Sequence, residues 1–315
     1  MTDGVPPPPD SPDQGIPWHF GDPLREQRWL IEGSGVVDLG NRGLLRVIGE
    51  DRLTWLHALT TQHLEQLAPQ ASSTALILDP QGHVEYELHL VDDGAATWII
   101  CQPGQAEPLQ AYLESMRFML RVAIEHEDNH YAVLWAARPL SDLTWSPPST
   151  FQGRGFVGFE SILTREAYQQ ALANAEHRCG SWALEALRVA AGVPRIGQET
   201  DQRTIPNEVG WLNTAVHLQK GCYRGQETVA KVHNLGRPPR RLVLILLDGS
   251  AEQPPNHGDA VLFDGREIGF IGTGVQHFEL GPIATAIVKR SVPEDAPLLV
   301  RTADGDLPAH QELQL

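Results

Sequence analysis

The sequence predicts an α+β protein with a small all-β domain at its C-terminus. Amphipathic helices and strands are mixed without a regular repeat up to about residue 240. From residue 241 onward, short apolar strands are separated by turns rich in glycine and proline. A chain of 315 residues is also long enough for two or three domains. We therefore expect a tail at 1–18, an α+β region at 19–240 and a β-barrel domain at 241–315.

Residues 1–18 are rich in proline and aspartate, and this composition predicts a disordered tail. The segment lacks the basic and apolar stretches of a signal peptide, and no apolar run approaches the ~20 residues of a membrane span. The three cysteines are far apart and include no Cys-x-x-Cys pair, which argues against a zinc ribbon or a four-cysteine iron–sulfur site. The simplest expectation is a cytoplasmic protein with reduced thiols and no membrane contact.

The α+β region begins with a strand, a helix and a hairpin. Leucines recur at three- to five-residue steps after Asp51, which predicts the helix. Pro80 and Gly82 occupy the second and fourth positions of a turn, and apolar and polar residues alternate after it. The expected elements are strands at 44–48, 74–78, 83–90 and 98–101, a helix starting near 51 and a helix at 109–116.

The second half of this region ends in a segment of a different kind. Residues 204–222 have no clear periodicity, which often marks a functional segment. Before it we expect a strand at 131–137, a loop at 142–159, a helix at 166–178 and a helix from an N-cap at Ser181 to Gly192. The C-terminal strands are expected at 242–247, 260–263, 267–271 and 283–288.

The net charge of −16, from 24 basic and 40 acidic residues, argues against general binding to polyanions. Residues 220–241 are an exception, because six basic side chains there are accompanied by the single acid Glu227. Such a patch suits a phosphate or a carboxylate tail through charge-assisted hydrogen bonds, or it is a solvated linker.

The sharpest local feature is the octapeptide 220–227, KGCYRGQE. Cys222 lies two residues from both Lys220 and Arg224, and nearby cations favour a thiolate over a thiol. The two glycines allow a tight turn and a close approach of a ligand. A structural cysteine in a loop with unrelated surface charges would give the same pattern.

Two weaker candidates are also present. His83, Glu85, Glu87 and His89 share one strand face, which is most simply a hydrated sheet face, and otherwise a metal site or the wall of a polar cleft. We assign no metal ligands among the site residues.

The second weak candidate is Glu208 with Trp211. An acid beside an aromatic ring can bind a heteroaromatic ligand, because the aromatic ring stacks on the ligand and the acid accepts hydrogen bonds from its N–H groups. A surface glutamate near a core tryptophan would give the same sequence pattern. No Walker A, HExxH or GxSxG motif is present, and the glycines at 269–274 lie in an all-β region unlike that of a dinucleotide loop.

The octapeptide resembles the K-G-C-Y-x-G-Q-E signature of the YgfZ family. These are folate-binding proteins related to the glycine cleavage T-protein, an aminomethyltransferase. Residues 47–51 (VIGED), 187–194 (LRVAAGVP) and 206–208 (PNE) resemble further segments of that family, so the resemblance covers roughly residues 30–300.

The resemblance implies a T-protein-like fold of three parts around a central channel that binds tetrahydrofolate. It also implies an accessory role for iron–sulfur enzymes, one of which modifies tRNA, so that tRNA is involved only indirectly. Cys222 is then the functional thiol at the mouth of the channel. The residues assigned to folate are Glu85, Glu208, Trp211, Lys220, Tyr223, Arg224, Gln226 and Glu227.

Two alternatives stay open, and with them the question of whether the protein is an enzyme. T-proteins carry an Asp-Asp pair on the strand after the hairpin turn, where this chain has Glu85 and Tyr86, and they lack the cysteine octapeptide; both differences argue against aminomethyl transfer. A nucleic-acid-binding module would use the basic patch at 220–241, but Tyr223 is the one aromatic residue there, whereas single-strand binding interleaves several.

Overall fold

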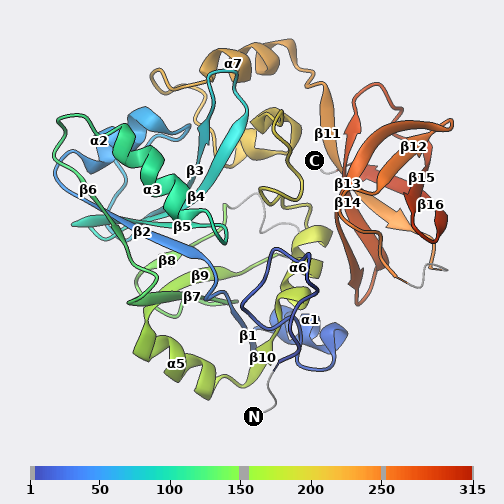
Figure 1. Cartoon of the computed structure of the whole chain (residues 1–315), viewed down its shortest axis with the longest axis horizontal. Helices are drawn as coiled ribbons and strands as arrows, with labels where there is room; N and C mark the ends of the chain where they lie inside the picture. Colours follow the sequence, from blue (N-terminus) through green and yellow to red (C-terminus); the bar gives the residue numbers. More distant parts are fainter. Residues whose placement is uncertain (1–3, 149–155, 250–252, 314–315) are drawn as a thin grey trace.

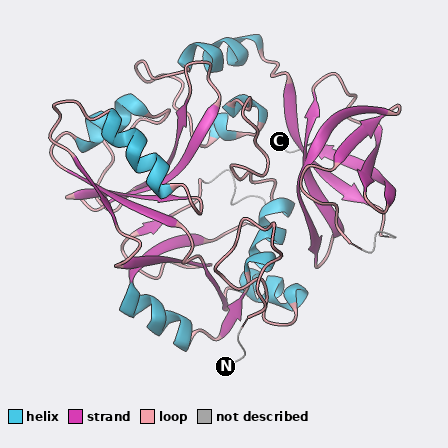
Figure 2. Cartoon of the chain, viewed as in Figure 1, coloured by secondary structure: helices cyan, strands magenta, loops and turns pink. Residues whose placement is uncertain are grey.

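The computed structural model describes residues 4–148, 156–249 and 253–313. Two five-stranded sheets form one side of the molecule and a closed barrel of six strands forms the other (Figure 1). Figure 2 shows helices beside both sheets, whereas the described part of the barrel region consists of strands and loops. The α+β class and the C-terminal barrel are therefore confirmed.

The first sheet has the strand order β3-β4-β5-β2-β6. Its core contains Leu45, Leu56, Leu88 and Leu109, all fully buried. The strands are β2 (Gly43–Ile48), β3 (Ser72–Leu78), β4 (Val84–Asp92), β5 (Ala96–Cys101) and β6 (Ala123–His126), with helices α2 (Arg52–Leu59) and α3 (Ala106–Ser115). Each element expected in this region is confirmed, within a few residues at its ends.

The second sheet has the order β10-β1-β7-β9-β8. Its strands are β1 (Gly35–Asp38), β7 (Tyr131–Ala136), β8 (Thr144–Trp145), β9 (Phe159–Thr164) and β10 (His177–Cys179), with helices α1 (Pro23–Glu32), α5 (Arg165–Asn174) and α6 (Ser181–Ala190). Two predictions are wrong here. The expected loop at 142–159 contains β8, and the helix expected to reach 178 ends at Asn174, because β10 pairs in parallel with β1.

The N-terminal segment, residues 4–18, is packed against the body, so the prediction of a disordered tail is wrong for these residues; residues 1–3 lie outside the described part. Asp13 and Ile16 are each 4% exposed. The carbonyls of Pro17 and Trp18 accept the N–H groups of Ser181 and Trp182 at 3.0 and 3.1 Å. These backbone groups replace a side-chain cap, so Ser181 is the first residue of α6 rather than its N-cap.

The barrel has the strand order β11-β14-β13-β12-β15-β16. Its strands are β11 (Arg240–Leu247), β12 (Ala260–Phe263), β13 (Arg266–His277), β14 (Gly281–Lys289), β15 (Pro297–Thr302) and β16 (Gly305–Leu313). The last two were not predicted. The amide of Gln27 in α1 donates to Gln276 O at 2.9 Å and accepts from Phe278 N at 3.0 Å, which joins the barrel to the second sheet's helices.

The segment that joins α6 to the barrel contains short helices and turns. It includes η1 (Pro206–Glu208), η2 (Trp211–Asn213) and α7 (Gln226–Leu235). Among the helices of the described residues, none has both the length and the hydropathy that crossing a membrane requires.

Candidate functional site

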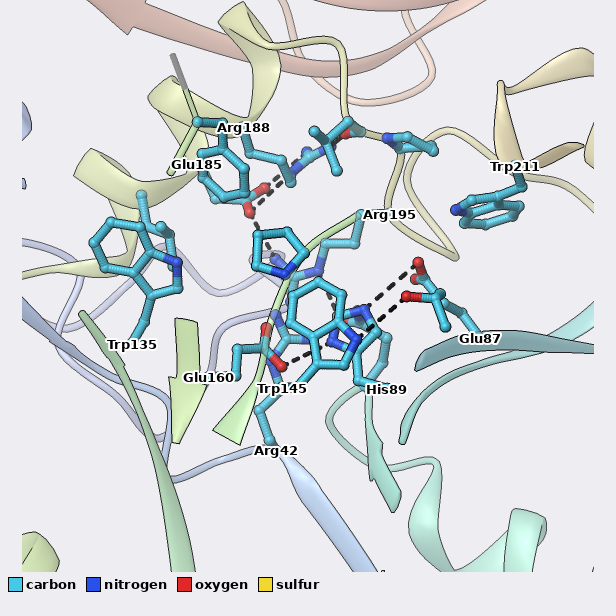
Figure 3. Close-up of a pocket in the computed structure, with 17 residues that line it drawn as sticks. Arg42, Glu87, His89, Trp135, Trp145, Glu160, Glu185, Arg188, Arg195 and Trp211 are labelled. Atoms are coloured by element: carbon cyan, nitrogen blue, oxygen red, sulfur yellow. Dashed lines mark hydrogen bonds and ion pairs between the residues drawn. The ribbon is translucent and has the colours of Figure 1, made fainter. Parts of the chain in front are cut away.

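A small enclosed cavity lies where the two sheets, α6 and the segment after α6 meet. Its volume is about 60 Å³. Three indoles line it, together with acidic and basic side chains that point toward one another (Figure 3). The side chains that matter for its chemistry are Arg42, Glu87, His89, Trp135, Trp145, Glu160, Glu185, Arg188, Arg195 and Trp211.

His89 is the centre of one polar cluster in the cavity. Its Nδ1 is 2.8 Å from Glu160 of β9, and its Nε2 is 3.7 Å from Glu87 of β4. Burial opposes the charged ring, but the two carboxylates outweigh that effect and raise the pKa of His89 to about 9. The positive ring in turn lowers the pKa of Glu160 against the effect of its own burial. At neutral pH this cluster therefore contains an imidazolium between two carboxylates.

Trp145 covers the imidazole of His89. The two rings are parallel, with 3.7 Å between their centroids and 2° between their planes. The indole N–H donates to Thr74 Oγ1 at 3.2 Å, and Trp145 is 6% exposed. Trp145 thus occupies space that a flat ligand ring would need.

A second cluster centres on Glu185 of α6. Arg188 binds both of its carboxylate oxygens, at 3.0 and 2.9 Å, and Arg195 approaches it at 3.4 Å. Burial favours the neutral acid, but these two cations outweigh it and lower the pKa of Glu185 to about 2. Arg195 also binds Asp13 at 2.7 Å and so connects the cavity to the N-terminal segment.

The cavity corrects the interpretation of the face that carries His83, Glu85, Glu87 and His89. A hydrated face is wrong for Glu87, which is 8% exposed, and for His89, because β8 and β9 of the second sheet pack against them. The cleft alternative holds for these two residues.

Apart from Trp211, the other members of the cavity wall were missed. A signal was present for two of them, because Glu160 and Glu185 are the single acids within largely apolar stretches, FESILT and WALEALRVA.

The octapeptide lies elsewhere, at the tip of the β3–β4 hairpin beside α7 (Figure 1). The Lys220 ammonium donates to the carbonyls of His57 and Thr60 at the C-terminal end of α2, and burial lowers the pKa of Lys220 to about 8. Its Nζ is also 5.2 Å from the ring centroid of Tyr223, which is 8% exposed. The side chains of Lys220 and Tyr223 therefore have a structural role.

Gly225 explains the second glycine of the octapeptide. Its φ is +79°, and a Cβ there would lie 2.6 Å from Asp79 O and 2.7 Å from Gly82 Cα. The bend thus packs directly on the hairpin turn. Cys222 is exposed on this bend, but it is not part of the wall of the cavity, and neither are Gln226 and Glu227 at the start of α7.

Glu208 also lies outside the cavity wall. It is 3% exposed, and its two oxygens accept from Arg240 at 2.9 and 2.8 Å. Arg240 binds Asp201 as well and holds the pKa of that acid well below its usual range, against the effect of burial. Of the residues assigned to folate, Trp211 alone lines the cavity, at 1% exposure.

Glu85 and Arg224 face each other at 3.5 Å and line a separate, open groove of about 630 Å³. The basic patch expected at 220–241 is dispersed. Lys220 is buried, Arg240 is paired with acids, and Arg241 donates to barrel carbonyls. Half of the basic side chains on which the nucleic-acid alternative depended are therefore engaged within the protein, whereas Arg224, Lys231 and Arg237 remain exposed.

The architecture is that of a three-part α+β protein, with two sheets, a barrel and a cavity lined by tryptophans and charged side chains.

No protein-family model matches the chain. A solved structure of glycine cleavage system aminomethyltransferase T from Bartonella henselae superimposes with a TM-score of 0.78, at 16% identity, over 95% of this chain and 91% of that one. The fold is therefore that of the T-protein.

Sequence relatives agree with this fold. A chloroplastic "putative transferase" of Arabidopsis thaliana is 26% identical over 287 residues, which are 80% of this chain. The match spans 65% of that protein's length, just under two thirds. An aminomethyltransferase of Synechococcus sp. (strain CC9902) is 24% identical over 87% of this chain and 86% of its own. One from Rippkaea orientalis is 25% identical over 88% and 84%.

Proposed function

We propose that the protein binds tetrahydrofolate, with the pterin ring in the cavity between the two sheets. The observation that carries the proposal is the lining of that cavity: three indoles beside Glu87, Glu160 and Glu185, in a T-protein fold. Indoles stack on a flat heterocycle, and carboxylates accept from its ring N–H and amino groups. The family that the octapeptide resembles is one of folate-binding proteins, and two of the relatives are named aminomethyltransferases.

The donor set fits a pterin, but the space requires a rearrangement. A cavity of about 60 Å³ holds only a handful of water molecules at roughly 10–15 Å³ each. Trp145, itself a fused two-ring system, lies flat on His89. We infer that the ligand ring takes the place of this indole, so that Trp145 leaves the stack when folate binds.

A titration of the purified protein with tetrahydrofolate tests the site. We expect saturable binding, followed by tryptophan fluorescence, that Glu87→Gln weakens about 10-fold or more because a charge-assisted bond is worth roughly 1.5–3 kcal/mol. Glu85→Gln is the matched control, because Glu85 lies on the same strand but faces the open groove. Equal effects of the two variants, or no saturation, would contradict the proposal.

The resemblance placed a pterin contact at Glu208, and a third variant separates the two acids. Because Arg240 already binds both oxygens of Glu208, we expect Glu208→Gln to lower stability more than folate affinity. A selective loss of folate binding in Glu208→Gln would return the pterin to that residue.

For the cellular role we propose the YgfZ type: a cytoplasmic accessory protein for iron–sulfur enzymes, with tRNA modification affected only indirectly. The octapeptide and the exposure of Cys222 support it, because an exposed thiol is free to react or to contact a cluster. In a strain that lacks the gene, Cys222→Ala should fold but fail to restore iron–sulfur enzyme activity. Full restoration would contradict the role of the thiol.

Aminomethyl transfer is the second candidate, and two observations favour it. The Synechococcus and Rippkaea relatives are named aminomethyltransferases. Glu87, on the strand after the hairpin turn, supplies an acid inside the cavity, whereas Glu85 on the same strand lines the separate groove. Formation of methylene-tetrahydrofolate from an aminomethylated lipoyl carrier tests it directly. Turnover that survives Cys222→Ala and is lost in Glu87→Gln would assign the protein to this reaction.

A further inference from the structure

Three histidine rings, none of which lines the tryptophan cavity, gather beside the C-terminal end of α2. The ring centroids of His57 and His63 are 4.8 Å apart, and those of His63 and His217 are 5.3 Å apart. One ligand atom from each of His57, His63 and Glu65 lies within 4.8 Å of the others. His57 is 9% exposed, whereas Glu65 is open to solvent.

The backbone holds the two contributing segments together. Thr61 Oγ1 donates to Ala215 O at 2.6 Å, and His217 N donates to Thr61 O at 2.9 Å. His217 is therefore fixed next to the loop that carries His63 and Glu65. A site built on paired segments loses little conformational entropy when an ion binds.

We propose that His57, His63 and Glu65 bind a divalent transition-metal ion of the Zn²⁺ class, with His217 or water completing the coordination. Two imidazoles and one carboxylate are ligands that zinc accepts, whereas Ca²⁺ and Mg²⁺ prefer oxygen ligands alone. Ligands at about 2.0–2.2 Å from zinc lie roughly 3.3–3.6 Å apart, so side-chain shifts of about 1 Å bring the three atoms into range.

The surroundings both help and oppose an ion. The Lys220 ammonium donates to the carbonyls of His57 and Thr60, which places a cation beside the candidate ligands. The same Lys220 repels a cation, and Glu65 supplies the negative charge that offsets it. Leu64 N donates to His57 Nδ1 at 3.2 Å, and binding exchanges this long hydrogen bond for a metal–nitrogen bond.

With His217 as the fourth ligand, the ion would join residues 57–65 to residue 217, five residues before Cys222. It would thus stabilise the base of the octapeptide, independently of whether folate binds in the tryptophan cavity.

Calorimetric titration of the tag-free, chelator-treated full chain with Zn²⁺ tests the site. We expect one ion per chain, and visible absorption bands of a tetrahedral type when Co²⁺ replaces it. His63→Ala removes a metal ligand and should weaken Zn²⁺ binding by at least about 10–100-fold. That is the order of magnitude expected for loss of a hydrogen-bond partner of a ligand, and loss of the ligand itself should cost no less. Glu65→Gln, at an exposed position, should weaken binding without loss of folding.

Two control variants separate this site from adventitious binding. His233→Ala removes an exposed histidine from α7 and should leave binding unchanged. Cys222→Ser should also retain the ion, which excludes chelation by the exposed thiol. Absence of stoichiometric binding overturns the proposal, as does equal binding by His63→Ala and His233→Ala or loss of the ion in Cys222→Ser.

Discussion

At the scale of single residues, the chemistry of the cavity depends on buried charges that neutralise one another. His89, Glu160 and Glu87 bring together one cation and two anions contributed by two different sheets. A buried charge is costly unless it is paired and hydrogen-bonded, so the state of one group sets the pKa of the next.

His89 should make stability depend on alkaline pH. Its pKa rises from 6.5 to about 9 on folding, so its contribution is complete below pH 6.5 and disappears as the pH passes through 9. That contribution is up to about 3 kcal/mol, at 1.36 kcal/mol for each pKa unit. The difference in unfolding free energy between wild type and His89→Gln should therefore shrink between pH 6.5 and pH 9 in urea titrations.

Glu160 provides the check on this prediction. Glu160→Gln removes the largest cause of the raised pKa of His89. In that background, the change with pH in the difference in unfolding free energy between His89 and His89→Gln should become much smaller. A difference in unfolding free energy that grows toward high pH would contradict the assignment of a charged imidazole at His89.

Residue types alone predicted part of this site. Glu87 and His89 were recognised as a pair on one strand face, and the cleft interpretation was available. Which interpretation holds depends on the second sheet, whose strand β9 is more than 65 residues away in sequence. No local pattern encodes that packing, and for the same reason Glu208 gave no sign that Arg240 would occupy it.

At the scale of elements, short-range signals predicted the β3–β4 hairpin and helices α2, α3, α5 and α6, whereas α1 and α7 were not predicted. The Asp-Pro-Gln-Gly turn forms, with Gly82 N donating to Asp79 O at 3.1 Å, because proline and glycine prescribe their own backbone angles. Strands β1, β6, β8, β9, β10, β15 and β16 were missed. Strand β10, for example, is specified by its parallel pairing with β1, and β15 by its pairing with β16, rather than by an alternation of its own. The octapeptide likewise depends on a neighbouring element, the hairpin turn.

Gly225→Ala should uncouple the octapeptide from that hairpin. The new Cβ would meet Asp79 O at 2.6 Å, at a φ of +79° that alanine adopts only at a cost of roughly 1–2 kcal/mol before any clash. We expect a loss of at least that size in unfolding free energy. Gly221→Ala is the matched control, because its Cβ meets nothing within 4 Å. Similar losses in both variants would show that the packing is not responsible.

At the scale of the whole molecule, buried ion pairs connect parts that the sequence presented as separate. Glu199, fully buried, accepts from Arg188 at 3.0 Å and from Thr273 of the barrel at 2.7 Å. Arg195 binds Glu185 on α6 and Asp13 in the N-terminal segment. The start of the barrel strands at Arg240 coincides with the change in composition there. The buried connections leave no such trace in the sequence, because each joins distant residues of common types.

The N-terminal segment should therefore contribute to the stability of the cavity. Asp13→Ala leaves the buried guanidinium of Arg195 with Glu185 and Gln102 as its remaining partners. Breaking a buried pair by removing one partner costs about 3–5 kcal/mol, and the remaining partners should hold the loss near the lower end of that range. Asp10→Ala, at an exposed position in the same segment, should cost nothing measurable in urea unfolding. If Asp13→Ala and Asp10→Ala unfold at the same urea concentration, the segment rests on the body without stabilising it, and the cavity owes its geometry to the two sheets and α6 alone.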